Sequence, residues 1–379
     1  MMKRLFLIFQ ALAFVQYSYC QSYPVFGNEI PVSILGDTVS DAMEPFISPD
    51  GNTLFFNSLN NGTTTSLYYS TRVNDSTFTF MGPLTGANIA NPHLDAVASL
   101  DSANGFFWVT TRNYPATYHN LFHGVFTGNS VNDTGRVYGT IYIYTPGWLI
   151  MDAAIDYNSD FLYYANAYFN TCGASPCISQ LGIGQKVNDS TYNKLPNSDA
   201  LLKNINDTSY LVYAENVTKD GLELYYTRIK KSAPATEICV AVRNTPADTF
   251  SLPAVVYADP AYIEEAPTLT TNKAILYYHK KETTNYKIYM RYRVGTTGVK
   301  QMADYSVVKI YPNPTSGMVH IYFQNNNEVT ETKLYDMFGQ LKLDGRNVTQ
   351  VDMAGYASGV YIMVNQDCKG VWVNKITKL

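Results

Sequence analysis

The most regular feature of the chain is a pattern of short apolar strands that recurs between residues 44 and 290. In each copy an acidic residue precedes a turn such as SPDG, and an aromatic-rich run such as 54–56 (LFF) follows. Short runs with alternating apolar and polar positions predict β-strands, and Pro, Asp and Gly predict tight turns between them. The acidic residues that begin the five copies are Glu44, Asp95, Asp152, Asp199 and Glu265.

These copies predict a β-propeller. One such sheet cannot bury both of its faces, so the copies are expected to stack around an axis. The spacing between copies leaves no room for a hidden blade, which favours five blades, with six as the alternative. Residues 22–37 resemble the segment that leads into the second copy, and we expect them to close the ring by pairing with the last blade.

The pattern changes near residue 304. A stiff turn at 311–317 (YPNPTSG) precedes short alternating strands at 319–323, 332–335, 360–364 and 371–376. About 75 residues with strands at this spacing predict a small Ig-like β-sandwich. The predicted organisation is all-β: a signal peptide at 1–20, a propeller at 21–303 and a sandwich at 304–379.

The N-terminus has the features of a secretory signal. Lys3 and Arg4 precede an apolar run of 11 residues at 5–15, which is too short to span a bilayer. Cleavage after Cys20 is expected, and lipidation of Cys20 is the alternative. No later stretch is long and apolar enough to predict a membrane-spanning segment after signal cleavage.

Composition narrows the class of partner. Asp and Glu number 31 against 27 Lys and Arg, which gives a net charge of −4, and the chain has 32 tyrosines. Nucleic acid and anionic membranes require a basic face, so neither is expected as a partner. Tyrosine is common on pleated, half-buried strands, which agrees with an all-β fold.

Two parts of the sequence resemble known families. The acidic residue, proline, SPDG turn and aromatic strand of the repeat resemble the TolB-like β-propeller repeat. The motifs YPNPTSG, KLYDMFGQL and VDMAGYASGVYIM, followed by a basic end, resemble the type A sorting domain of the type IX secretion system. The sorting-domain residues that carry this resemblance are Tyr311, Pro312, Asn313, Pro314, Gly317, Asp336, Gly339, Gly359, Tyr361 and Lys375.

The second resemblance implies a route out of the cell. It implies a Gram-negative envelope, Sec export, and interaction with the type IX translocon and a sortase-like peptidase. It also implies that the protein is secreted or attached to the outer surface. The extracellular ligand, a glycan or a protein, is not identified by the sequence.

The sequence contains no recognisable catalytic or metal-binding motif: it has no phosphate-binding loop, GxSxG elbow, HExxH or EF-hand spacing. We therefore assign no catalytic residue, metal or cofactor; calcium is the ion that clustered carboxylates would suit. Cys172 and Cys177 enclose a short loop, for which a disulfide is expected in an oxidising compartment rather than a zinc site.

The acids Glu44, Asp95, Asp152 and Asp199 are candidate residues at the mouth of the channel. They are interpreted as acceptors that bond the backbone between blades, because an acid that recurs in most blades is typical of a fold requirement. Alternatively, they bind a cation or act in pairs on a glycosidic bond. The predicted function is an exported or cell-surface propeller that binds a glycan, a peptide or an envelope protein; the alternative is a polysaccharide hydrolase.

Overall fold

The computed structural model describes residues 22–59, 64–88, 94–110, 119–169, 175–294, 308–323, 331–366 and 371–379. These residues form two compact units, one within 23–295 and the other at the C-terminal end. The predicted signal peptide, Cys172 and the predicted boundary at residue 304 lie outside the described residues. The Cys172–Cys177 disulfide therefore stays a prediction.

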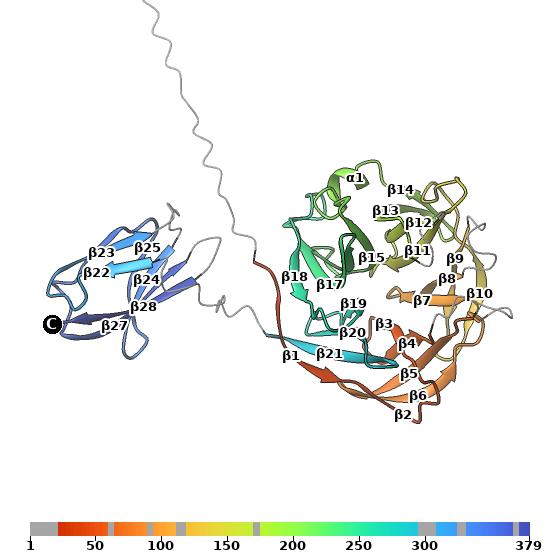
Figure 1. Cartoon of the computed structure of the whole chain (residues 1–379), viewed down its shortest axis with the longest axis horizontal. Helices are drawn as coiled ribbons and strands as arrows, with labels where there is room; N and C mark the ends of the chain where they lie inside the picture. Colours follow the sequence, from red (N-terminus) through yellow and green to blue (C-terminus); the bar gives the residue numbers. More distant parts are fainter. Residues whose placement is uncertain are drawn as a thin grey trace, which may run out of the picture. The chain divides into compact units, whose positions relative to one another are not determined.

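The larger unit is a five-bladed β-propeller, in which each blade is an antiparallel meander of four strands (Figure 1). The inner strands are β3 (Met43–Ile47), β7 (Asp95–Leu100), β11 (Trp148–Ile155), β15 (Tyr210–Val217) and β19 (Glu264–Leu269). The second strands are β4 (Thr53–Asn57), β8 (Gly105–Thr110), β12 (Phe161–Tyr168), β16 (Glu223–Lys230) and β20 (Ile275–Lys281). The third strands are β5 (Leu67–Asn74), β9 (Leu121–Phe126), β13 (Ile178–Asn188), β17 (Ala233–Val242) and β21 (Tyr286–Val294). The outer strands are β6 (Thr77–Pro83), β10 (Val131–Arg136), β14 (Thr191–Lys194), β18 (Ala254–Tyr257) and β1 (Val25–Pro31).

The N-terminal strand closes the ring, as the sequence predicts. β1 pairs antiparallel with β21 and becomes the outer strand of the fifth blade. A short strand, β2 (Ser33–Leu35), then runs parallel to β6 of the first blade. The first and last blades are therefore joined by one continuous segment of chain, and two sheet edges are covered.

Hydrophobic packing also follows the ring. Each of five core clusters combines residues of two successive blades, and one of them joins the fifth blade to the first. Tyrosines provide much of this core, and Tyr225, Tyr226, Tyr277 and Tyr278 are fully buried. Since aromatic side chains bury large areas, the high tyrosine content is explained by contacts between the blades.

The turn that follows each inner strand is closed in the same way, by a side-chain oxygen that accepts a backbone N–H. In the first blade the hydroxyl of Ser48 accepts the N–H of Thr53 at 2.9 Å, and Gly51 takes a positive φ of 75°. In the second and third blades, Asp101 and Asp156 accept backbone N–H groups in the same role. A serine, threonine or aspartate at this point closes the hairpin and ends the inner strand.

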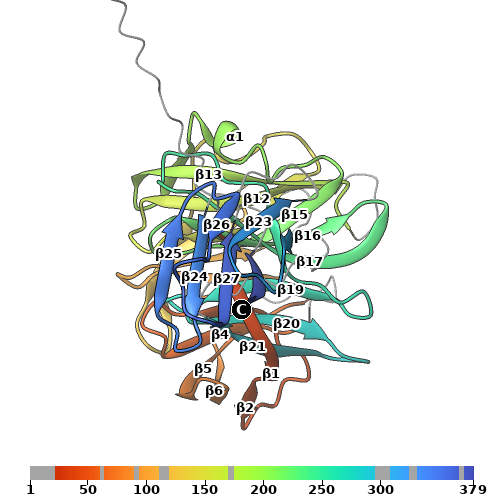
Figure 2. The same ribbon diagram turned by 90° about the vertical axis from the view of Figure 1, so that its left-hand side faces the viewer.

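The smaller unit is a β-sandwich. One sheet contains β22 (Val308–Tyr311), β23 (Met318–Phe323) and β26 (Gln350–Asp352). The other contains β25 (Leu341–Gly345), β24 (Glu331–Asp336), β27 (Gly359–Gln366) and β28 (Val371–Lys378), and Figure 2 shows β25, β24 and β27 side by side. Its core joins both sheets through residues such as Val319 and Trp372, so this unit has a hydrophobic core of its own.

Candidate functional site

A narrow cavity of about 30 Å³ lies between the five inner strands. Figure 1 shows these strands around the axis of the propeller. Every blade contributes to its wall. The lining residues are Glu44, Pro45, Phe46, Val97, Ala98, Asp152, Ala153, Ala154, Ala214, Glu215, Asn216, Ala266, Pro267 and Thr268.

A β-bulge lies in each inner strand beside this cavity. The register shifts between Met43 and Phe46 in β3, and β7, β11, β15 and β19 shift at corresponding places. In four blades the bulge holds a non-glycine residue at positive φ, which is a strained conformation. These residues are Glu44 (51°), Val97 (56°), Ala214 (52°) and Ala266 (58°).

The backbone N–H of each strained residue donates a hydrogen bond to a side chain of the preceding blade. Three of these acceptors are neutral groups on second strands: Asn57 Oδ1 accepts from Val97, Thr227 Oγ1 from Ala266, and His279 Nδ1 from Glu44. In the remaining case Asp152 Oδ2 accepts from Ala214 at 3.3 Å. The structural role expected of the repeated acids is thus performed mainly by neutral residues.

This ring of hydrogen bonds makes a prediction about stability. Replacing Thr227 by valine keeps the shape but leaves the buried N–H of Ala266 without its 3.0 Å acceptor. The free energy of unfolding should fall by about 1–3 kcal/mol, the usual cost of an unsatisfied buried donor. Denaturant melts should show no comparable loss for Thr284→Val, whose side chain is exposed; equal losses would contradict this role.

Four carboxyl groups from four blades meet around the cavity. Glu44 of β3 is partly exposed, whereas Asp152 of β11 and Glu215 of β15 are buried. Glu265 of β19 is next to them, because its charge acts on both Glu44 and Asp152. Both carboxylate oxygens of Glu215 are buried and have no hydrogen-bond partner among the described residues.

Three of these groups bind protons tightly. Burial raises the pKa of Glu44 to about 8, helped by the charges of Asp152 and Glu265. Burial also raises the pKa of Asp152 to about 7, against the lowering effect of the Ala214 N–H and with a further rise from the charge of Glu265. The pKa of Glu215 is raised well above its usual value by burial and by Asp152.

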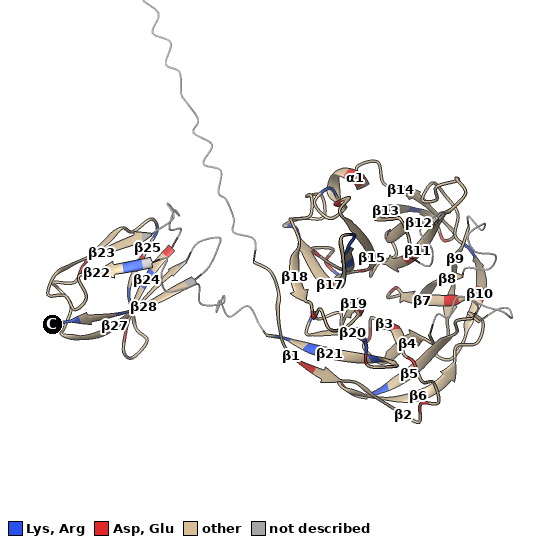
Figure 3. Ribbon diagram, viewed as in Figure 1, with Lys and Arg blue, Asp and Glu red and all other residues tan. Residues whose placement is uncertain are grey.

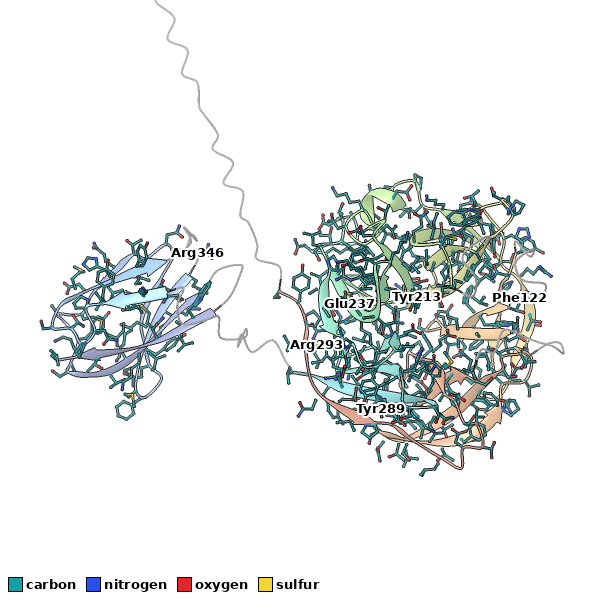
Figure 4. All side chains as sticks on the ribbon, viewed as in Figure 1. Phe122, Tyr213, Glu237, Tyr289, Arg293 and Arg346 are labelled. Carbon is teal, nitrogen blue, oxygen red and sulfur yellow. The ribbon has the colours of Figure 1, made fainter. Side chains whose placement is uncertain are left out.

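Glu265 behaves in the opposite way. Burial tends to raise its pKa, but the hydrogen bonds that Glu265 forms with His279 and Tyr213 outweigh this, and the pKa is lowered. The Tyr213 hydroxyl donates to Oε1 at 2.5 Å, and His279 Nε2 lies 3.2 Å from Oε2. Because His279 Nδ1 accepts the N–H of Glu44, the proton of the neutral imidazole is on Nε2, facing Glu265. Tyr213 lies near the centre of the ring (Figure 4).

The structure brings together only some of the acids singled out in the sequence. Glu44 and Asp152 each lie three residues before the last paired residue of their inner strand. Asp95 lies five residues before that point in β7, and its carboxylate accepts the indole N–H of buried Trp108 at 3.2 Å. Asp199 is not on an inner strand: it lies on the short helix α1 (Ser198–Leu201), exposed and ion-paired with Lys194.

The fourth copy was assigned in the wrong register. Asp199, expected to begin the fourth copy, precedes the inner strand β15, so the acid that this blade contributes to the cavity is Glu215. Glu265, which lies one residue farther from its turn than Glu44 does, also belongs to the group. The sequence feature that could have located this acid is Glu215 itself, a glutamate within the largely apolar run 210–217.

Three further observations concern metal-binding groups, membrane-spanning helices and the distribution of positive charge. Among the described residues, no group of three His, Cys, Asp or Glu side chains is arranged to hold a metal ion. No helix within the described ranges is long and apolar enough to cross a membrane. Lys and Arg are spread over several strands of the propeller rather than gathered on one (Figure 3).

The motif residues of the C-terminal unit hold its turns together. Asn313 donates to the carbonyl of Lys375 at 2.6 Å and accepts the N–H of Thr377, which ties the YPNPTSG turn to β28. Asp336 accepts the N–H groups of Phe338 and Gln340. Gly339 takes a positive φ of 77° in the same turn, and the Tyr361 hydroxyl donates to the carbonyl of Ala357.

The described chain is thus a β-propeller protein with a separate C-terminal β-sandwich. Comparison with known families identifies the sandwich. Residues 309–378 match the family of secretion system C-terminal sorting domains. This unit is a type IX sorting domain, and the chain is exported to be secreted or attached to the outer surface. A search of curated protein sequences finds no relative of the chain.

Solved structures similar to the chain include TolB from Acinetobacter baumannii, with 11% identity and a TM-score of 0.37 over 68% of this chain. The match covers only 55% of that TolB chain. A family 117 glycoside hydrolase of Zobellia galactanivorans has 10% identity and a TM-score of 0.47 over 71% of this chain and 90% of its own. An endo-arabinase of Bacteroides thetaiotaomicron has 12% identity and a TM-score of 0.44 over 73% and 99%.

Proposed function

We propose that this protein is an exported propeller that binds an extracellular ligand, a glycan, a peptide or an envelope protein, at the acidic mouth of its channel. The observation that carries the proposal is the Glu215 carboxyl group, which is buried in the channel wall without a hydrogen-bond partner among the described residues. A buried polar group without a partner costs free energy, and folding alone gives no reason to keep it there.

The positions of the acids support the same conclusion. An acid required by the repeat would occupy one position in every blade, as the serine, threonine or aspartate of the hairpin turn does. The channel acids instead occupy three different levels: Glu44 and Asp152 share one, Glu215 lies one residue nearer the turn, and Glu265 one residue farther away. Asymmetry of this kind is typical of a site and not of a fold requirement.

A binding screen tests the proposal. The full exported chain should bind members of a glycan array or a peptide library at the channel mouth. Glu265→Gln and Glu44→Gln should weaken that binding at least tenfold, because both side chains are partly exposed, Glu44 lines the cavity and the charge of Glu265 acts on it. Asp199→Asn, on exposed α1, is the control and should bind as the wild type does. Ligands that bind both mouth variants with unchanged affinity would place the site elsewhere.

One observation favours the second candidate, an extracellular polysaccharide hydrolase. The environment lowers the pKa of Glu265 and raises that of Glu44 to about 8, so at neutral pH one carboxyl is ionised and the other protonated. Two carboxyls with separated pKa values suit base and acid roles on a glycosidic bond. Release of reducing sugar from a polysaccharide panel, lost in Glu265→Gln, would put this activity first; no release from the panel would exclude it for those substrates.

A further inference from the structure

The walls of the channel combine carboxyl groups with small apolar surfaces. Glu44, Asp152 and Glu215 alternate around the axis with alanines at 98, 153, 154, 214 and 266 and with Pro45 and Pro267. All the lining residues except Glu44 and Val97 are buried, so the space between them is narrow. A space this narrow suits a linear alkyl chain rather than a ring-shaped ligand.

The ionisable groups that line this space are all carboxyls. No lysine or arginine is among the residues that line the cavity. Glu215 is only 6% exposed, and both of its oxygens are buried without a hydrogen-bond partner in the described structure. The missing partner is therefore a donor or a cation that enters from outside. The described side chains do not form a metal-binding group, which favours an organic cation.

We infer that the channel receives a primary ammonium group on a straight alkyl stem, as the lysine side chain of a peptide provides, an assignment that rests on the proposed function of the acidic mouth. The ammonium donates to the carboxylates of Asp152 and Glu215, and the stem lies against the alanines and prolines of the wall. Lysine combines a compact charged head with an apolar stem. The planar guanidinium of arginine is wider and fits a narrow channel less well.

Binding of the ammonium group releases protons. The titratable groups around the site are Glu44 of β3, Asp152 of β11, Glu215 and Tyr213 of β15, Glu265 of β19, His279 of β20 and Tyr286 of β21. β7 contributes only Val97 and Ala98 to the lining. The carboxyls must ionise to accept a cation, so affinity should rise as the pH increases from 6 to 8.

Calorimetry on the full chain tests the inference with n-butylammonium as the probe. At pH 8 n-butylammonium should bind with the release of protons, and 1-butanol, which has no charge, should not. Affinity should be at least tenfold weaker at pH 6. Glu215→Gln and Asp152→Asn should each weaken binding at least tenfold while Asp199→Asn leaves it unchanged. Thermal melts of both channel variants establish that they fold.

A peptide pair then connects the probe to the proposed ligand. Nα-acetyl-lysine methylamide should bind, whereas its norleucine counterpart should not and its arginine counterpart should bind at least tenfold more weakly. Absence of n-butylammonium binding at pH 8, equal binding by Glu215→Gln, or preferential binding of calcium would each overturn the inference. If a glycan or peptide still requires Glu265 while n-butylammonium does not bind, the proposed function stands and only this inference fails.

Discussion

Replacing Asp152 by asparagine is expected to stabilise the folded protein at pH 8. In the folded state burial raises the pKa of Asp152 to about 7, against 3.8 for an ordinary aspartate. The folded protein therefore holds this proton more tightly than the unfolded chain does. Its stabilising contribution is complete below about pH 4 and is lost as the pH rises through 7.

The expected gain at pH 8 is roughly 4 kcal/mol, since the pKa rises from 3.8 to about 7 and one pKa unit corresponds to about 1.4 kcal/mol. Asparagine retains an oxygen that can accept the N–H of Ala214, so little should be lost at pH 4. Thermal melts between pH 4 and pH 8 measure the effect. Asp199→Asn is the matched control, because the same substitution at an exposed ion pair should leave the pH dependence unchanged. An Asp152→Asn protein that is less stable than wild type at pH 8 would restore the structural interpretation of the acid.

The second large effect concerns export. Deleting residues 304–379 should retain a folded propeller inside the cell envelope, because the sorting domain has a hydrophobic core separate from those of the blades. In a host with a type IX secretion system, immunoblots of medium and surface fractions should show at least a tenfold loss of exported protein. A carrier protein of the periplasm fused to residues 304–379 should gain export in the same host. Export of the truncated chain at normal levels would contradict the role of the domain.

The fold could be predicted because every blade repeats the same local pattern of strands and turns. The run of aromatic residues in β4, β8, β12 and β20, and the turn that precedes each, repeat closely enough to favour five blades over six. Closure by β1 followed from the similarity between its segment and the one before β7. The sorting domain was recognisable because residues such as Asn313 and Asp336 make side-chain bonds to turn backbone that few other residue types can make.

The site could be predicted only in part, because its position depends on the bulges. A bulge adds a residue to one strand and turns the following side chains, and this cannot be read from an alternating pattern. Asp95 therefore seemed equivalent to Glu44 although it lies two residues farther from the turn. The neutral residues that hold the bulges, Asn57, Thr227 and His279, lie on second strands, and their role appears only when the blades are side by side.

The central claim is that carboxyl groups from separate blades meet in one buried channel. Carboxyl ¹³C NMR of the full chain, labelled at the side-chain carboxyls of Asp and Glu, tests it most directly. Among the carboxyls that line the channel, the structure predicts two that titrate near pH 8 and pH 7, the first absent in Glu44→Gln and the second in Asp152→Asn. Glu264, which does not line the channel, also has its pKa raised to about 7 by burial and should remain in both variants. If Glu44 and Asp152 instead titrate at their ordinary values near 4.5 and 3.8, the claim is contradicted.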